Sequence, residues 1–151
     1  MTLNNAKVLI VGSSLLEKKT IFNKLIEYND PPKPSLLNRG VQVYPAELNA
    51  FTSINMWLCV DSEFDLEYYA KSHLAIVVVD ARISDPNQEV ERYASYVHNL
   101  VGSPIPIFVV YTHCDLEKPL EVSHQEKYVE VYPTSGVNII KEPLIEIVKN
   151  L

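Results

Sequence analysis

Three short runs of almost entirely apolar residues constrain the fold of this 151-residue chain more than any other feature of its sequence. They span Lys7–Gly12, Leu74–Asp80 and Ile105–Tyr111, and each is rich in β-branched residues. A strand with this pattern is covered on both faces, as the central strands of a parallel sheet are. We therefore expect the three runs to form the middle of such a sheet.

Segments with helical spacing of apolar residues separate these runs, and alternation of strands with helices is typical of a parallel sheet with helices on both faces. An Asp-Pro pair before the middle segment and a glycine after it are start and stop signals for a helix. The expected helices follow Gly12, surround Phe64–Lys71, lie between Asp85-Pro86 and Gly102, and close the chain with Pro143 near the start.

A strand pair of a different kind is expected before the second apolar run. Val41–Tyr44 and Ser53–Val60 are strand-like and only the short turn region Pro45–Phe51 joins them, so they should be antiparallel. A weak strand near Tyr128–Tyr132 brings the count to six. The prediction is an α/β three-layer sandwich, with a six-stranded, mostly parallel sheet and one antiparallel edge hairpin, formed by residues 1–151 as a single domain.

Charge and hydropathy exclude some classes of partner. With 13 basic and 19 acidic residues the net charge is −6, so nucleic acid is not an expected partner. No apolar run approaches the roughly 18 residues of a membrane span, and the first residues lack a signal-peptide pattern. We expect a cytoplasmic protein without direct membrane insertion. Only 4 glycines are present, which argues against a site built from a glycine-rich loop.

The two cysteines, Cys59 and Cys114, lie within or at the end of apolar runs. Buried free cysteine is a common core residue, and this is the interpretation we favour. A disulfide, or a metal site shared with His113, is the alternative, although no C-x-x-C spacing supports it. No metal site and no catalytic residue is predicted.

The segment after the first apolar run partly matches a phosphate-binding loop, G-x-x-x-x-G-K-[ST], whose amides, lysine and hydroxyl bind phosphates and Mg²⁺. Gly12 and Lys18 match the first glycine and the lysine. Glu17 replaces the second glycine, and Lys19 replaces the metal-binding hydroxyl, with Thr20 one position later. The loop is therefore damaged, and an ordinary strand-to-helix turn is the simpler interpretation.

With this loop, the layout of the whole chain resembles the Ras-like small GTPases. The family's W-D-x-A-G motif, which binds Mg²⁺ and senses the terminal phosphate, falls near Trp57. Aligning on Trp57 puts Leu58 at the aspartate and Asp61 at the glycine; aligning on Asp61 puts Phe64 at the glycine. Neither alignment supplies the switch, and Ser35 is the only hydroxyl near the first switch position.

The guanine-recognition motif of that family, N-K-x-D, corresponds to Thr112-His113-Cys114-Asp115. Asp115 keeps the carboxylate that the resemblance assigns to the guanine ring. A further motif, S-A-K, aligns with Tyr132-Pro133-Thr134 and is not matched. Loss of the metal-binding hydroxyl, the metal-binding carboxylate and the water-positioning residue should remove several kcal/mol of transition-state stabilisation, so GTP hydrolysis is not expected.

We therefore interpret the chain as a degenerate GTPase domain, a pseudoGTPase, and expect no cofactor. The alternative is an active GTP-binding molecular switch with an atypical phosphate loop, and a third is a response-regulator-like signalling domain with Asp61 as acceptor. If GTP or GDP binds, the expected binding residues are Gly12, Lys18, Lys19, Thr20, Thr112 and Asp115.

Within the degenerate relatives, one stretch of about forty residues is similar to the alpha- and gamma-adaptin-binding protein family. The resemblance implies an accessory or assembly factor for clathrin adaptors in vesicle trafficking, with adaptin subunits as partners, and a longer protein of which this is the N-terminal portion. It rests on Val43-Tyr44-Pro45, Leu58-Cys59-Val60, Phe64, Ser72, Ala75 and Val77-Val78.

Four aromatic residues could form the contact surface for a protein partner. They are Trp57, Phe64, Tyr68 and Tyr69. Tyrosine and tryptophan are favoured at the centres of protein interfaces. The alternative is that Phe64 and Tyr69 pack beneath the short helix.

Overall fold

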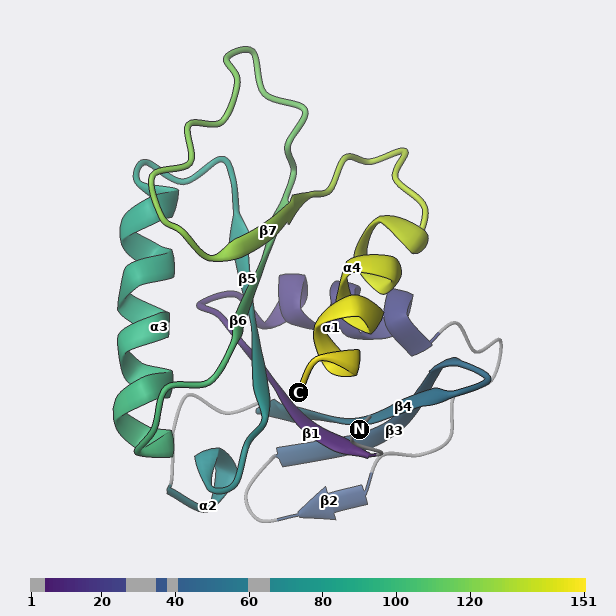
Figure 1. Cartoon of the computed structure of the whole chain (residues 1–151). Coiled ribbons are helices and arrows are strands. Elements are labelled where there is room, and N and C mark those ends of the chain that lie inside the picture. The colour runs from purple at the N-terminus through teal and green to yellow at the C-terminus, as the bar shows by residue number, and fades with distance from the viewer. Residues whose placement is uncertain (1–4, 27–34, 38–40, 60–65) are drawn as a thin grey trace.

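A seven-stranded mixed sheet forms the centre of the computed structural model, which describes residues 5–26, 35–37, 41–59 and 66–151 (Figure 1). The strands are β1 (Ala6–Val11), β2 (Ser35–Leu37), β3 (Val41–Asn49), β4 (Thr52–Cys59), β5 (Leu74–Asp80), β6 (Ile107–Thr112) and β7 (Lys127–Glu130). Their order in the sheet is β2-β3-β4-β1-β5-β6-β7.

The three apolar runs form β1, β5 and β6, as predicted. These strands are adjacent and parallel, and every side chain of β6 is buried. β1 also pairs in parallel with β4, and β6 with β7. Because the strands are covered on both faces, they are apolar throughout instead of alternating.

The antiparallel part of the sheet is larger than predicted. β3 and β4 form the expected hairpin. β2 pairs antiparallel with the start of β3, so β2 and not the hairpin lies at the edge of the sheet. The six predicted strands are all present, and β2 adds a short seventh strand beyond the hairpin. A strand of three residues is too short to show a period in the sequence.

The hairpin turn is also tighter than predicted. β3 continues through Pro45 to Asn49, so Ala50 and Phe51 alone connect it to β4. A proline lacks the N–H that a ladder needs and is tolerated at an unpaired strand edge. β2 pairs only with residues 41–43, which leaves Pro45 without a neighbour on that side in the described ladder. The proline therefore lies inside a strand instead of ending it.

Helices cover both faces of the sheet (Figure 1). The helices are α1 (Leu15–Ile26), α2 (Leu66–Tyr69), α3 (Pro86–Val101) and α4 (Asn138–Lys149). On one face α1 and α4 pack through residues such as Ile21, Leu25 and Leu144. On the other face α2 and α3 pack through residues such as Tyr69 and Val97. The α/β class and the helical layers on both faces agree with the prediction.

The helix boundaries follow the predicted signals at α3 and depart from them at α4. The carboxylate of Asp85 accepts the N–H of Gln88 at 3.1 Å, and Gly102 ends α3 in a left-handed conformation with φ 83°. Helix α4, however, begins at Asn138, and Pro143 lies inside it instead of near its start. Burial of Ile140, Leu144 and Val148 on one face stabilises the helix despite this internal proline.

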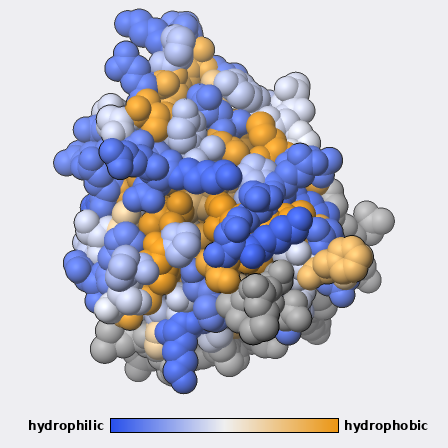
Figure 2. All heavy atoms as spheres, viewed as in Figure 1, coloured by the Kyte–Doolittle hydropathy of each residue, from blue (hydrophilic) through white to orange (hydrophobic). Residues whose placement is uncertain are grey.

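No helix in the described ranges has both the length and the apolar content needed to cross a membrane. On the face seen in Figure 2, apolar side chains are exposed in patches that polar side chains interrupt.

Tyr68 ties α2 to the centre of the sheet. Its side chain is 2% exposed, and its hydroxyl donates to the backbone oxygens of Ile10 at 3.0 Å and Trp57 at 2.7 Å. Its ring packs edge-on against the rings of Trp57 and Tyr69. One phenol therefore joins β1, β4 and α2.

We expect Tyr68→Phe to lower the free energy of unfolding by about 1–3 kcal/mol, because it leaves buried carbonyl oxygens without their donor. Urea unfolding followed by circular dichroism measures the change. The matched control is Tyr128→Phe, since Tyr128 is exposed and keeps its ring, and it should change stability by less than about 0.5 kcal/mol. Equal stability of the two variants would contradict the bracing role of Tyr68.

Candidate functional site

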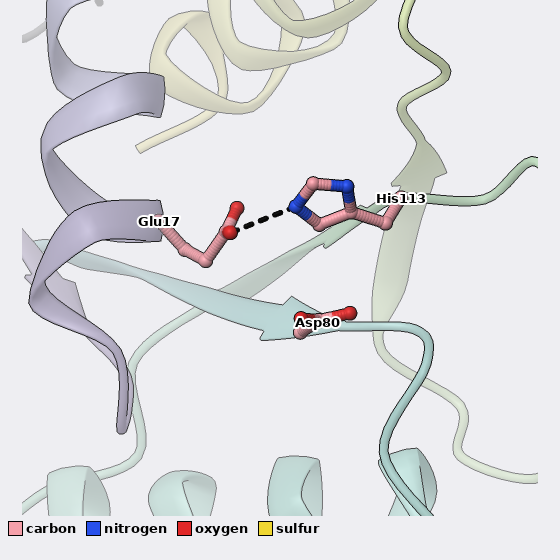
Figure 3. Close-up of side chains that lie close together, drawn as sticks. All are labelled: Glu17, Asp80 and His113. Atoms are coloured by element: carbon pink, nitrogen blue, oxygen red, sulfur yellow. Dashed lines mark hydrogen bonds and ion pairs between the residues drawn. The ribbon is translucent and has the colours of Figure 1, made fainter.

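The carboxyl ends of β1, β5 and β6 form the edge of the sheet at which ligands of parallel α/β domains bind. Three polar side chains come together there from segments far apart in the sequence. Glu17 lies in the first turn of α1, Asp80 ends β5, and His113 directly follows β6. Figure 3 shows Glu17 and His113 pointing toward each other, with Asp80 beside them. This cluster is the candidate functional site.

Gly12 allows the turn between β1 and α1 to lie directly against β5. A Cβ atom at this position would lie 2.5 Å from the carbonyl oxygen of Val78, and the backbone φ is 157°. The buried side chain of Lys18 covers the glycine, with its Cγ 3.6 Å from the same Cβ position. Close packing on β5 therefore explains this glycine without a bound phosphate.

The start of α1 is capped within the chain. Ser14 Oγ accepts the N–H of Glu17 at 3.3 Å, and the Ser14 carbonyl oxygen accepts the N–H of Lys18 at 3.1 Å. A serine in this position satisfies amides that otherwise lack a partner in the first helical turn. Such amides bind phosphate where a helix start serves as an anion site. At α1 the amide of Glu17 has the Ser14 hydroxyl as its acceptor, and the bond from Lys18 is the first ordinary backbone bond of the helix.

A hydrogen bond joins the first turn of α1 to the residue after β6 across the cluster. Nε2 of His113 donates to Oε1 of Glu17 at 2.8 Å. The Glu17 side chain is 11% exposed and that of His113 is 36% exposed. His113 adopts the left-handed conformation with φ 55°, which is uncommon for residues other than glycine and directs its ring toward α1 (Figure 3). The pair thus links the start of α1 to the end of β6.

Arg82 holds Asp80, the third member of the cluster. Its Nε and Nη2 donate to the two carboxylate oxygens at 3.0 Å and 2.8 Å, and its backbone N–H donates to Oδ1 at 2.9 Å. The side-chain hydrogen bond from Arg82 is the largest cause of the lowered pKa of Asp80. The carboxylate of Asp80 is therefore ionised at neutral pH and has a fixed orientation.

The predicted nucleotide-binding residues differ in their exposure and in their hydrogen-bond partners. Lys19 and Thr20 are exposed, and the Thr20 hydroxyl donates to the Leu16 carbonyl at 2.9 Å within its own helix. Thr112 is buried, with its hydroxyl 3.4 Å from the Val79 carbonyl. Asp115 is exposed. Of the six predicted residues, Gly12 and Lys18 are the two in contact with each other beside the cluster.

Two of the four aromatic residues expected at a partner surface lie in the core. Tyr68 and Tyr69 are fully buried, and half-buried Trp57 is covered by the amino group of Lys7, 3.7 Å from the ring centroid. Phe64 and Asp61, which were compared with the W-D-x-A-G motif, lie outside the described residues. The two tyrosines thus stabilise the fold and do not present a contact surface.

The structure describes the side chain of one of the two cysteines, Cys114. Cys114 is buried and its thiol donates to the Tyr111 carbonyl at 3.3 Å, while burial raises its pKa to about 11. It is a core thiol, as expected. The side chain of Cys59 lies outside the described residues.

Sequence reasoning missed the cluster, because it assigned Glu17 and His113 to separate motifs. As a metal ligand, His113 was considered only together with the cysteines. A signal was present, since all three residues end or follow predicted parallel strands. Adjacent parallel strands bring such residues to one edge. One ligand atom from each of Glu17, Asp80 and His113 lies within 4.8 Å of the others, a spacing that suits a metal ion.

We expect Gly12→Ala to lower the free energy of unfolding by at least about 2 kcal/mol, because the new methyl group would overlap the Val78 carbonyl. Urea denaturation measures it. Gly136→Ala is the matched control, since a Cβ there meets nothing within 4 Å, and its stability should stay within about 0.5 kcal/mol of the parent. A neutral Gly12→Ala would show that close packing does not require this glycine.

No protein-family model and no curated protein matches this chain. The features that bear on its function are those of the site itself: the capped start of α1, the hydrogen bond between Glu17 and His113, and Asp80 held by Arg82.

Proposed function

We propose that this chain is a non-hydrolysing, small-GTPase-like module, a pseudoGTPase, that binds a protein partner. When the three-residue edge strand β2 is set aside, the strand order is β3-β4-β1-β5-β6-β7 with only β3 antiparallel, and this order supports the Ras-like topology that the sequence resemblance implies. The helices on both faces agree with it as well. Fold alone is weak support for function, so the site must carry the proposal.

The observation that carries it is the hydrogen bond between Glu17 and His113. This hydrogen bond joins the segment that the resemblance assigns to the phosphates to the segment that it assigns to guanine recognition. At both positions, side chains that would bind nucleotide are replaced by side chains that bind each other. A phosphate at the start of α1 would lie beside the Glu17 carboxylate. Two like charges about 4 Å apart near a protein surface repel by about 4 kcal/mol, more than one charge-assisted hydrogen bond returns.

Mg²⁺-dependent chemistry has little support from the described residues. The Thr20 hydroxyl donates within α1, and Lys19 faces solvent. Lys18, which lies against Gly12, is the feature that most favours the alternative of an active GTP-binding switch. One lysine cannot replace the metal and the amides together, because phosphoryl transfer depends on their combined charge.

The proposed biological role follows from the resemblance to the alpha- and gamma-adaptin-binding proteins. We propose an accessory or assembly factor for clathrin adaptors, with adaptin subunits as partners. The stretch that carries the resemblance includes the paired strands β3 and β4 and most of β5.

We expect no binding of GTP or GDP tighter than about 1 mM in the presence of Mg²⁺, and no phosphate release, because Glu17 repels phosphate and the Glu17 amide at the helix start already has the Ser14 hydroxyl as its acceptor. Calorimetric titration of the purified protein measures binding. Anion-exchange chromatography of the denatured protein's supernatant detects nucleotide that co-purifies. Micromolar binding, or one guanine nucleotide per chain, would favour the switch instead.

We expect purified alpha- or gamma-adaptin subunits to bind the immobilised chain with micromolar affinity. Biolayer interferometry with an active small GTPase as the immobilised control measures specific binding. Binding to neither subunit would overturn the adaptor role, whereas the nucleotide titration independently tests the pseudoGTPase assignment.

A further inference from the structure

We propose that Glu17, Asp80 and His113 bind a divalent transition-metal ion, for which Zn²⁺ is the best fit. Three separate segments supply the ligands: the first turn of α1, the end of β5 and the residue after β6 (Figure 3). This inference does not depend on the pseudoGTPase assignment, because it concerns a cation and not a nucleotide.

The spacing of the three ligand atoms is close to that of a zinc site. Zinc binds nitrogen and oxygen ligands at about 2.0–2.2 Å in tetrahedral geometry, so two ligand atoms lie about 3.4 Å apart. In the cluster they lie within 4.8 Å of one another, and Glu17 and His113 are 2.8 Å apart. Side-chain rotations that change these separations by up to about 1.4 Å would give the zinc spacing. A metal ion between Glu17 and His113 would replace the proton that their hydrogen bond contains.

The ligand types favour zinc over the alkaline-earth ions. An imidazole nitrogen suits Zn²⁺ and other transition metals, whereas Mg²⁺ and Ca²⁺ prefer oxygen ligands alone. Three protein ligands leave the fourth position of a zinc ion to water. The partial exposure of His113 gives a metal ion access from solvent.

The charges around the cluster favour a cation. Asp80 is hydrogen-bonded to Arg82, and the negative charges of Glu17 and Asp115 also raise the pKa of Arg82, so three carboxylates face two cations, Arg82 and the Lys18 that lies against Gly12. Because Arg82 fixes the carboxylate of Asp80, it provides the outer hydrogen bonds that commonly orient a metal ligand. Arg82 is 58% exposed, so its side chain has room to move when a second cation arrives.

Zinc alone is the probe. Calorimetry against a chelator of known affinity should give one Zn²⁺ per chain, and Co²⁺ should give the visible absorption of a tetrahedral site. Glu17→Gln, Asp80→Asn and His113→Asn should each weaken Zn²⁺ binding at least about 100-fold, since loss of an outer hydrogen bond alone weakens metal sites by about 10–100-fold. Asparagine also tolerates the left-handed backbone of His113.

Glu121→Gln is the control, because Glu121 is an exposed carboxylate outside the cluster, and its Zn²⁺ affinity should match that of the parent. Circular dichroism checks that each variant is folded, and added Zn²⁺ should raise the Tm of the parent and the control but not of the three cluster variants. Absence of Zn²⁺ binding, or binding that the three cluster variants retain, would overturn the proposal.

Discussion

The close packing of the turn after β1 against β5 is the constraint on which the candidate site depends. Gly12 has no side chain, so its backbone lies where any Cβ atom would overlap the Val78 carbonyl. The turn therefore enters α1 close to the ends of β5 and β6, and the first helical turn brings Glu17 to Asp80 and His113. A wider turn would separate these side chains, although each strand would remain in place.

Local patterns were enough to predict the central strands and the ends of α3. Residues of β1, β5 and β6 are apolar because both faces are covered, and Asp85 and Gly102 cap their helix by local hydrogen bonding and backbone conformation. Pro45 and Pro143 misled the prediction for one shared reason. A strand or helix continues through a proline when no neighbouring carbonyl needs the missing N–H and when the rest of the strand or helix is buried. Both conditions depend on tertiary structure, not on the local sequence.

The candidate site was beyond local patterns in a stronger sense. Glu17 and His113 are 96 residues apart, and their contact depends on sheet order, on the turn at Gly12 and on the left-handed backbone of His113. Sequence comparison with a GTPase motif registers each residue only as a mismatch. In the structure these two residues form one hydrogen bond, so the two positions are physically coupled.

The pairing of Glu17 with His113 makes this edge of the sheet better suited to cations than to anions, the opposite of a phosphate site. A helix start with open amides and a lysine attracts anions. Here the Ser14 hydroxyl satisfies one of those amides, that of Glu17, and the carboxylates of Glu17, Asp80 and Asp115 lie near the guanidinium of Arg82. Lys18 adds positive charge beside Gly12, whereas Glu17, Asp80 and His113 each offer a ligand atom within 4.8 Å of the others. An edge with this arrangement suits a small cation better than a triphosphate, so the proposed absence of nucleotide binding and the proposed metal site have the same physical cause.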